Sequence, residues 1–547
     1  MSTPFTSIIV CSGVRINNSY THTLYFENPN KQFEYFTSKR VKVFGHHVYC
    51  RRAWDIKLES KMEDALKWDY LYFLNPQDNK HYFYFITSVE YISDTTVKVH
   101  LEMDVLQTYL FDWDLRPCFV ERMTPVTDEV GENTVDEGLE VGELTIINKT
   151  DVNALQRGYC LMLMATEPLI YYTDSLFKEI FFQPKLGLTD GIFSGLSIYC
   201  CDLTEDGAYE RLGNFFEKIT NNSETVKNME GIVSMWLYPR DMVVSSKYAD
   251  SEDKKWDKTF SFVEASNHIN VTFNKFDYVD GGYAPKNKKL LSYPYTVLHV
   301  TNNNGGSADF RLERFSTPNA NFEIIGSVYP DGGVKLVPKN YNGTGYNDEA
   351  GITLTGFPTC AWDSDTYKIW LAQNQNQHAV AQKSATLSGA LGVGAMVAGA
   401  VTANPMMIAG GFASTVSGIT QTAQLLARIE DMKTTPDQAH GAQSASINAC
   451  NNKCTFTGYV KTVTTERAKI IDDYFTMYGY KHCRVMKPTI HNRSRFTFIK
   501  TVDCHVDGQF CNEDKLKIQA IFNNGVTFWA DTEGMGNYSI SNDFLEN

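Results

Sequence analysis

The chain has 547 residues, of which 43% are hydrophobic, 13% aromatic and 21% charged, and its formal net charge is −14. A chain of this length exceeds one ordinary hydrophobic core, so two to four domains are expected, and 33 Phe and 30 Tyr favour half-buried β-structure. The acidic balance argues against a dedicated nucleic-acid binder, because such a protein needs a basic stripe to displace counterions.

The N-terminus and the cysteines both indicate a protein that folds in a reducing cytosol. The first residues, MSTPFTSIIVCSG, lack the basic stretch and apolar run of a secretory signal. The 12 cysteines are scattered without paired spacing, which predicts free and mostly buried thiols.

The first 125 residues are typical of β-strands. In residues 97–104, apolar and charged side chains alternate, which places the apolar set on one face of a sheet. Residues 82–89 (YFYFITSV) predict a well-buried strand, and residues 90–96 supply the turn of an antiparallel hairpin.

Residues 126–345 combine predicted strands, loops and some helix. Residues 297–300 and 309–314 predict a second hairpin around the turn TNNNGGSA. Residues 205–220 predict a helix with Tyr209, Leu212, Phe215 and Phe216 on one face.

The last hundred residues predict two helices and a strand. Residues 467–478 place Ile470, Ile471, Tyr474, Phe475 and Tyr478 at helical spacing, and Gly479 follows as the residue that ends the helix. A second helix begins at Asn512, with Glu513 and Asp514 near its positive end, and carries Leu516, Ile518, Ile521 and Phe522. A strand at 526–529 follows.

One segment differs from a soluble domain in composition. The 44 residues 384–427, called here the uncharged block, carry no charge and contain seven glycines. Asn404-Pro405 divides its core, 385–427, into arms of 19 and 22 residues, and these two residues are the predicted hinge of a hairpin. As helices the arms would span roughly 28 to 33 Å, about the thickness of a bilayer core.

Three interpretations of the uncharged block remain open. The first is a permanent transmembrane hairpin, which would leave a long soluble segment before it without an export signal. The second is a buried core hairpin, although a core favours Leu, Ile and Phe over Gly and Ala. The third is a conditional segment, packed inside an assembly and later delivered to a membrane, which fits the modest hydrophobicity and the polar flanks best.

We expect the apolar side chains of both arms to partition into the membrane under the third interpretation. The predicted membrane-insertion residues are Leu387, Leu391, Val393, Met396, Val397, Val401, Met406, Met407, Ile408 and Phe412.

The sequence contains several weak catalytic or metal-site patterns, and we predict no catalytic residue, metal or cofactor from them. Gly392-x-Gly394 lacks the preceding strand of a dinucleotide loop, and the His46-His47 pair is typical of a strand at a surface. A set of possible metal ligands near the C-terminus has no zinc spacing, so buried thiols are the expectation for its cysteines. The set consists of Cys450, Cys454, His482, Cys483, Cys504, His505 and Cys511.

Acidic residues gather between positions 128 and 143. A pair of carboxylates for cell-wall cleavage would be compatible with this composition, but a solvated acidic loop is the default interpretation. The residues concerned are Asp128, Glu129, Glu132, Asp136, Glu137, Glu140 and Glu143.

Four collinear segments resemble the tail-knob, or distal tail tube, proteins of short-tailed phages (Salasmaviridae and Rountreeviridae). They are TVKVHLEMDVLQTYLF (96–111), NTVDEGLEVG (133–142), MYGYKHCRVMKP (477–488) and AIFNNGVTFWADTEGMGNYSISNDFL (520–545). The uncharged block lies between the second and third of these, where the family has a membrane-active loop. Residues 150–345 match only in patches such as YPYTV (293–297).

The resemblance implies a mainly β fold with helical insertions and a hexameric tube. Residues 1–125 and 455–547 would form the tube wall, 126–345 the knob, and 346–454 an extended segment with the membrane-active loop at its core. Phe528, Trp529, Tyr538 and Ile540 should then pack with the N-terminal strands.

The resulting hypothesis is a virion protein at the distal end of a short phage tail, present in the host cytoplasm during assembly. Its partners would be copies of itself, other tail proteins such as the lower collar, the host cytoplasmic membrane, and viral DNA that passes the lumen without specific binding. The main alternative is a receptor-binding tail adhesin without membrane activity. A pore-forming toxin and a cell-wall hydrolase are further alternatives.

Overall fold

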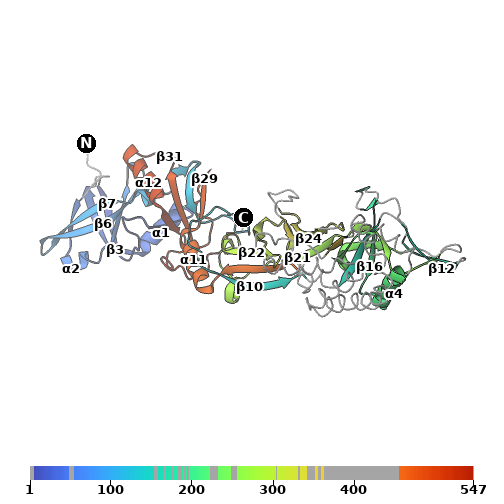
Figure 1. Cartoon of the computed structure of the whole chain (residues 1–547). Coiled ribbons are helices and arrows are strands. Elements are labelled where there is room, and N and C mark those ends of the chain that lie inside the picture. Colours follow the sequence, from blue (N-terminus) through green and yellow to red (C-terminus); the bar gives the residue numbers. More distant parts are fainter. Residues whose placement is uncertain are drawn as a thin grey trace, which may run out of the picture. The chain divides into compact units, whose positions relative to one another are not determined.

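The computed structural model describes residues 5–48, 55–152, 158–165, 168–174, 177–182, 188–189, 192–193, 196–221, 232–247, 255–303, 305–329, 333–341, 351–354, 359–361 and 455–545. The chain divides into two units (Figure 1). Unit 1 comprises residues 1–143, 277–295 and 463–547, and unit 2 comprises 144–276 and 296–462. The predicted assignment of chain segments to a tube wall and a knob stays a prediction.

Unit 1 contains an antiparallel six-stranded sheet built entirely from the N-terminal segment. The apolar alternation of β7 buries Val97, Val99 and Leu101, as the sequence predicts. In order across the sheet, the strands are β3 (Arg40–Val48), β1 (Phe5–Cys11), β5 (Tyr70–Asn75), β6 (Lys80–Ser93), β7 (Thr96–Met103) and β4 (Asp55–Glu59). The turn between β6 and β7 is shorter than predicted, because residues 90–93 continue the strand.

The second sheet of unit 1 joins the two ends of the chain. β2 (His22–Leu24) pairs in parallel with β32 (Val526–Trp529), so Leu24 lies opposite Trp529. The remaining strands in order are β30 (Phe496–Asp503), β9 (Cys118–Met123) and β29 (Tyr480–Met486), and a separate pair consists of β31 (Val506–Gly508) and β8 (Trp113–Leu115).

A shared core explains why these distant segments belong to one unit. Phe528 and Trp529 are fully buried with Leu24 and Tyr70, and Tyr538 packs against the same cluster. Ile540 does not belong to this cluster. Burial of large aromatic side chains is the main favourable contribution to such a junction.

Short sequence signals determine where the helices of unit 1 begin and end. In α11 (Thr465–Tyr478), the Thr464 side chain accepts a hydrogen bond from the Arg467 amide. Gly479 follows with φ +65°, and a Cβ there would lie 2.3 Å from the Met123 backbone, so glycine is required. The other helices are α1 (Pro29–Ser38), α2 (Met62–Ala65), α3 (Val105–Thr108) and α12 (Asn512–Asn524).

The buried faces of α11 and α12 differ from the predicted ones. Ile471 and Phe475 are buried, but Ile470 and Tyr478 are exposed, and the buried Asp472 takes part in the inner face instead. In α12, Ile518, Ile521 and Phe522 are buried, whereas Leu516 is exposed.

Asp472 holds the middle segment of unit 1 against α11. Its carboxylate accepts hydrogen bonds from the Tyr283 hydroxyl (2.7 Å), the Lys286 amide (2.8 Å) and the Asn287 amide (3.0 Å). This segment carries the short turns η4 (Asp280–Gly282) and η5 (Lys288–Leu291). A fully buried carboxylate with several donors is a stable anchor because each lone pair is satisfied.

Unit 2 also consists mainly of antiparallel sheets. One six-stranded sheet has the order β18 (Val243–Ser246), β20 (Ser261–Ser266), β16 (Ser197–Asp202), β11 (Tyr159–Ala165), β17 (Ile232–Pro239) and β27 (Thr359–Ala361). Two four-stranded sheets are β10 (Leu144–Asp151), β28 (Thr457–Val463), β22 (Thr296–Thr301) and β23 (Ser307–Phe310), and then β21 (Ile269–Phe273), β24 (Ala320–Gly326), β25 (Val334–Pro338) and β26 (Ile352–Leu354).

The smaller elements of unit 2 lie around these sheets. α4 (Ala208–Asn221) buries Leu212 and Phe215, but Tyr209 is exposed, contrary to the predicted apolar face. The remaining strands are β12 (Leu169–Asp174), β13 (Phe177–Phe182), β19 (Lys255–Trp256), β14 (Leu188–Thr189) and β15 (Ile192–Phe193), with the turns η3 (Arg240–Met242) and η6 (Leu312–Arg314). The predicted hairpin around residues 302–306 is formed by β22 and β23.

Candidate functional site

The predicted membrane-insertion residues lie outside the described residues. This holds for all ten residues from Leu387 to Phe412 and for the hinge at Asn404 and Pro405, and Gly392 and Gly394 are in the same stretch. Within the described ranges, no helix is long and apolar enough to cross a membrane. The insertion hypothesis therefore stays a prediction from the sequence.

Two acidic residues of the 128–143 loop are buried, which corrects the expectation of a solvated loop. Asp128 and Glu137 are both largely inaccessible to solvent, whereas Glu129 and Glu140 are exposed. Burial of a carboxylate is costly unless charges and donors surround it. The neighbours of both carboxylates meet this requirement.

Glu137 lies at the centre of a buried ion network in unit 1. Its carboxylate forms ion pairs with Arg122 of β9 and with Lys289 of η5, and it accepts a hydrogen bond from the Lys481 amide at 2.9 Å. Arg122 also donates to the Gly479 carbonyl at 2.6 Å. Burial lowers the pKa of Lys289 although Glu137 is adjacent. The network joins the loop to all three segments of unit 1.

Asp128 forms the second anchor of the same loop. Its carboxylate accepts hydrogen bonds from the Tyr480 hydroxyl (2.6 Å) and the Lys288 amide (2.9 Å). Burial raises the pKa of Asp128, and these two donors partly offset the effect. Because donors already occupy Asp128 and Glu137, their geometry favours structural anchoring over acid–base catalysis.

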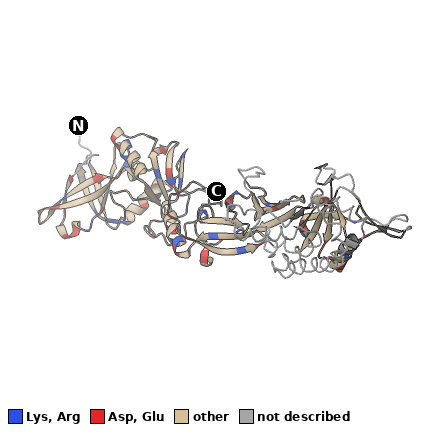
Figure 2. Ribbon diagram, in the orientation of Figure 1, with Lys and Arg blue, Asp and Glu red and all other residues tan. Residues whose placement is uncertain are grey.

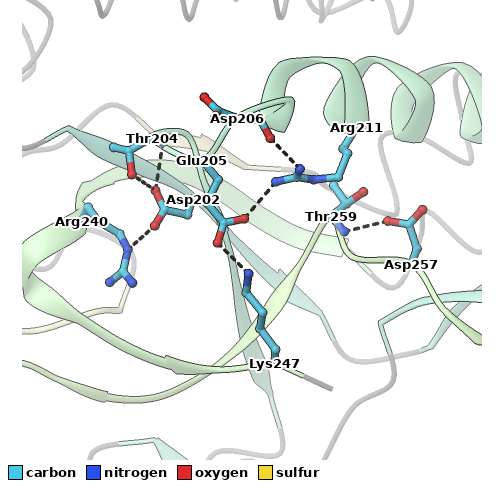
Figure 3. Close-up of polar contacts among 9 residues, drawn as sticks. All are labelled: Asp202, Thr204, Glu205, Asp206, Arg211, Arg240, Lys247, Asp257 and Thr259. Carbon is cyan, nitrogen blue, oxygen red and sulfur yellow. Dashed lines mark hydrogen bonds and ion pairs between the residues drawn. The ribbon is translucent and has the colours of Figure 1, made fainter. Parts of the chain in front are cut away.

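The polar cluster of unit 2 lies where β16 leads into α4 (Figure 3). Asp202 forms an ion pair with Arg240 and accepts hydrogen bonds from the amide (2.9 Å) and hydroxyl (2.5 Å) of Thr204. Burial would raise the pKa of Asp202, but the hydrogen bonds from Thr204 and the Arg240 guanidinium lower it below its usual value. Asp202 therefore stays ionised and fixes the turn before α4.

Glu205 continues this cluster towards solvent. It pairs with Arg211 at 3.0 Å and with Lys247 at 2.7 Å, and Arg211 also donates to the Asp206 carbonyl. Farther along, the Thr259 amide donates to Asp257 at 2.7 Å. Alternating charges satisfy one another here, which is typical of a structural surface network.

The candidate metal ligands are not brought together within the described part of the chain. There, no group of three or more His, Cys, Asp or Glu side chains is arranged to hold a metal ion. Cys504 and His482 are buried, Cys483 and His505 are exposed, and Cys450 and Cys454 lie outside the described residues. His47 lies in the edge strand β3, as expected for a strand residue.

Sequence reasoning missed the anchors Arg122, Lys289, Asp472 and Tyr480. Their signal in the sequence is weak, because polar residues such as Lys289, in the run KNKKLL, are expected at the surface. A polar residue at a buried position of the periodic pattern, as Asp472 is in α11, is the one local feature that indicates such an anchor.

Comparison with family models shows which family the chain belongs to. Residues 254–543 match the model of the C-terminal domain of tail knob protein gp9 from Bacillus phage phi29, and residues 4–114 match the caudoviral major tail protein N-terminus. The first match covers more than half of the chain. The chain belongs to the phage tail knob family. The predicted resemblance to this family is confirmed.

Individual tail knob proteins match along nearly the whole chain. Tail knob protein gp9 of Bacillus phage B103 is 25% identical, and that of Bacillus phage phi29 is 23% identical, each over 98% of both chains. The solved structure of the bacteriophage C1 tail knob protein, gp12, superposes with a TM-score of 0.64 at 15% identity and covers 99% of this chain. This likeness confirms the mainly β fold with helical insertions.

Family membership makes this chain a structural protein of a bacteriophage tail and a component of the virion. The named relatives are tail knob proteins, and a structural role agrees with the buried ion network around Glu137, which joins segments of unit 1. Acidic and basic residues are interspersed over the described parts of both units (Figure 2), consistent with a structural role.

Proposed function

We propose that this tail knob protein forms the distal tube and knob of a short phage tail, as a closed ring of identical subunits that is hexameric by analogy with its family. The uncharged block plugs the lumen and, on release, inserts into the host cytoplasmic membrane so that viral DNA can cross. The observation that carries the proposal is the 44-residue stretch without charge in a chain that is 21% charged as a whole.

The physical chemistry of the uncharged block supports conditional insertion. Apolar surface moved from water into lipid gains about 25 cal/mol per Å². Its Gly, Ala and Ser residues permit close approach of helices, which suits packing of several copies inside a ring. The polar segments on either side would allow the block to move away from the folded units.

The charge balance supports a conduit for DNA. At a net charge of −14, the protein repels a polyanion rather than binding it. DNA would therefore slide through the lumen without specific contacts. The remaining partners in this proposal are the other tail proteins, such as a lower collar, and the host membrane.

Two charges within the uncharged block test this proposal. Val397→Asp plus Ile408→Asp makes insertion costly, by roughly 2.5 to 3.5 kcal/mol per residue. We expect this variant to lose dye release from anionic liposomes while keeping its ring in sedimentation and electron microscopy. A matched control, Ala442→Asp plus Ala445→Asp, adds the same charge in the polar flank and should release dye like the wild type.

Three other results would overturn parts of the proposal. Unchanged leakage from the Val397/Ile408 variant would remove the membrane role of the uncharged block and favour the adhesin. A collapsed melting transition would show that the block is an ordinary buried core. A wild-type protein that stays monomeric at micromolar concentration would exclude the ring.

A further inference from the structure

Unit 1 exposes two small groups of large apolar side chains. One is the hairpin tip, residues 87–95, which comprises the end of β6 and the turn before β7, where Tyr91 and Ile92 are 55% and 43% exposed. The other is the β3 start, residues 39–43, where Val41 and Val43 are 58% and 46% exposed. Single exposed apolar residues are common, but neighbouring pairs indicate contact with another surface.

The register of the sheet explains why the β3 valines lack cover. Val43 lies opposite Ile9 of β1, and Ile9 lies opposite Tyr72 of β5. Tyr72 is fully buried in the core beneath α1, and the partly buried Ile9 packs against the same core. β3 is the edge strand of the described sheet, so the apolar face continues to Val43 without the cover that α1 provides farther inside. Val41 lies close by, at the register irregularity between Lys42 and Arg40, and is exposed as well.

The hairpin tip extends beyond the strand that should support it. β5 pairs with β6 only along Lys80–Phe85, whereas β6 continues to Ser93. Past Phe85, β6 pairs with β7 alone in the sheet of unit 1. Among the described residues, one backbone edge of the tip is therefore without a strand partner, and such an edge readily pairs with another polypeptide.

The two groups are complementary in charge. Residues 87–95 contain two acidic residues, Glu90 and Asp94, and no basic ones. Glu90 already lies 3.6 Å from Lys98 of β7, whereas Asp94 accepts a hydrogen bond from the Tyr91 hydroxyl and has no ion pair within the described chain. Residues 39–43 contain three basic residues and no acidic ones, of which Lys39 already pairs with Glu533 at 3.4 Å. Within the described chain, Arg40 has no ion pair. Like-charged surfaces would repel, so the tip fits the β3 start better than it fits a second tip.

We infer that the hairpin tip of one subunit docks on the β3 start of the next copy of this chain. Tyr91 and Ile92 would cover Val41 and Val43, and Glu90 and Asp94 would face Arg40 and its basic neighbours. Because the two surfaces differ, the contact is head-to-tail, and repetition of such a contact generates a ring. This inference rests on the ring of the proposed function and names the surface that closes it.

A mixing experiment with two full-length variants tests the head-to-tail contact. The tip variant is Ile92→Lys plus Asp94→Lys, and the β3 variant is Val41→Asp plus Val43→Asp. Each variant alone should lose the ring and sediment as a monomer. An equimolar mixture retains one intact pair of surfaces, so it should form 1:1 dimers that do not close into rings.

The outcomes separate this inference from the proposed function. Wild-type rings together with rings from both variants would overturn the contact but leave the ring intact. A monomeric wild type would overturn both. A mixture that stays monomeric, or a variant whose melting temperature collapses, would also overturn the contact, because the four side chains would then serve no interface or belong to the fold of the single chain.

Discussion

Glu137 of unit 1 and Glu205 of unit 2 each pair with two cations, but in different surroundings. The Glu137 side chain is 0% exposed and its partner Lys289 is 3% exposed. The Glu205 side chain is 36% exposed and its partner Lys247 is 69% exposed. Water screens the second set of charges and not the first. The same residue types therefore stabilise the fold of unit 1, whereas in unit 2 they form exposed ion pairs at a turn and contribute little to stability.

The largest expected effect is the removal of the buried charge. Glu137→Gln leaves Arg122 and Lys289 buried without a carboxylate, which should destabilise unit 1 by about 3 to 5 kcal/mol. Amide hydrogen exchange in β9 and β29 of the full chain would measure this loss of stability.

Glu140→Gln in the same loop is the matched control, because this side chain is 86% exposed. It should change the free energy of opening, as measured by hydrogen exchange, by no more than about 0.5 kcal/mol. Equal effects of the two variants would contradict the view that burial makes the difference.

Asp104 provides an intermediate case, since it is buried and accepts hydrogen bonds from neutral donors. The Tyr70 hydroxyl (2.9 Å) and the Gln107 amide (3.1 Å) donate to it. Burial raises the pKa of Asp104 from 3.8 to about 6, and these donors offset part of the effect. Its folded pKa thus lies above its unfolded value, so the folded state binds the proton more tightly.

The sign of the resulting pH dependence follows from this shift. The contribution of Asp104 to stability is greatest below the unfolded pKa and is lost as pH rises through about 6, in total about 2 to 3 kcal/mol. Asp104→Asn keeps a capping side chain for α3 and should remove this decline. Urea unfolding midpoints across this pH range should decline with pH in the wild type and not in Asp104→Asn. The exposed Asp64→Asn is the control and should keep the pH dependence of the wild type.

The smallest effect is expected at the exposed pairs of unit 2. Glu205→Gln removes ion pairs to Arg211 and Lys247 that water and salt already screen, so the loss should stay below about 1 kcal/mol and vanish at high salt. Urea unfolding at low and high ionic strength measures it. A loss as large as that of Glu137→Gln, unaffected by salt, would show that this cluster is more buried in the assembled protein.

Local patterns in the sequence predicted elements whose cause is local. The alternation of β7, the end of α11 at Gly479 and the strand Val526–Trp529 all depend on neighbouring residues, and the structure has them where they were expected. Helical spacing predicts that Ile470 and Leu516 are buried, but both are exposed in the structure. Spacing identifies the apolar residues of a helix without showing which side another element covers.

The membrane role proposed for the uncharged block is a prediction of the sequence by itself, because the absence of charge over 44 residues is visible without any fold. The four matching segments likewise predicted the tail knob family. Only the tertiary structure decided that Asp128 and Glu137 are buried, that β2 pairs with β32 across the whole chain, and that residues 277–295 are held by Asp472. The physical reason is that burial and ion pairing depend on residues that can lie hundreds of positions away. A local sequence pattern does not specify which distant segment will pack against it.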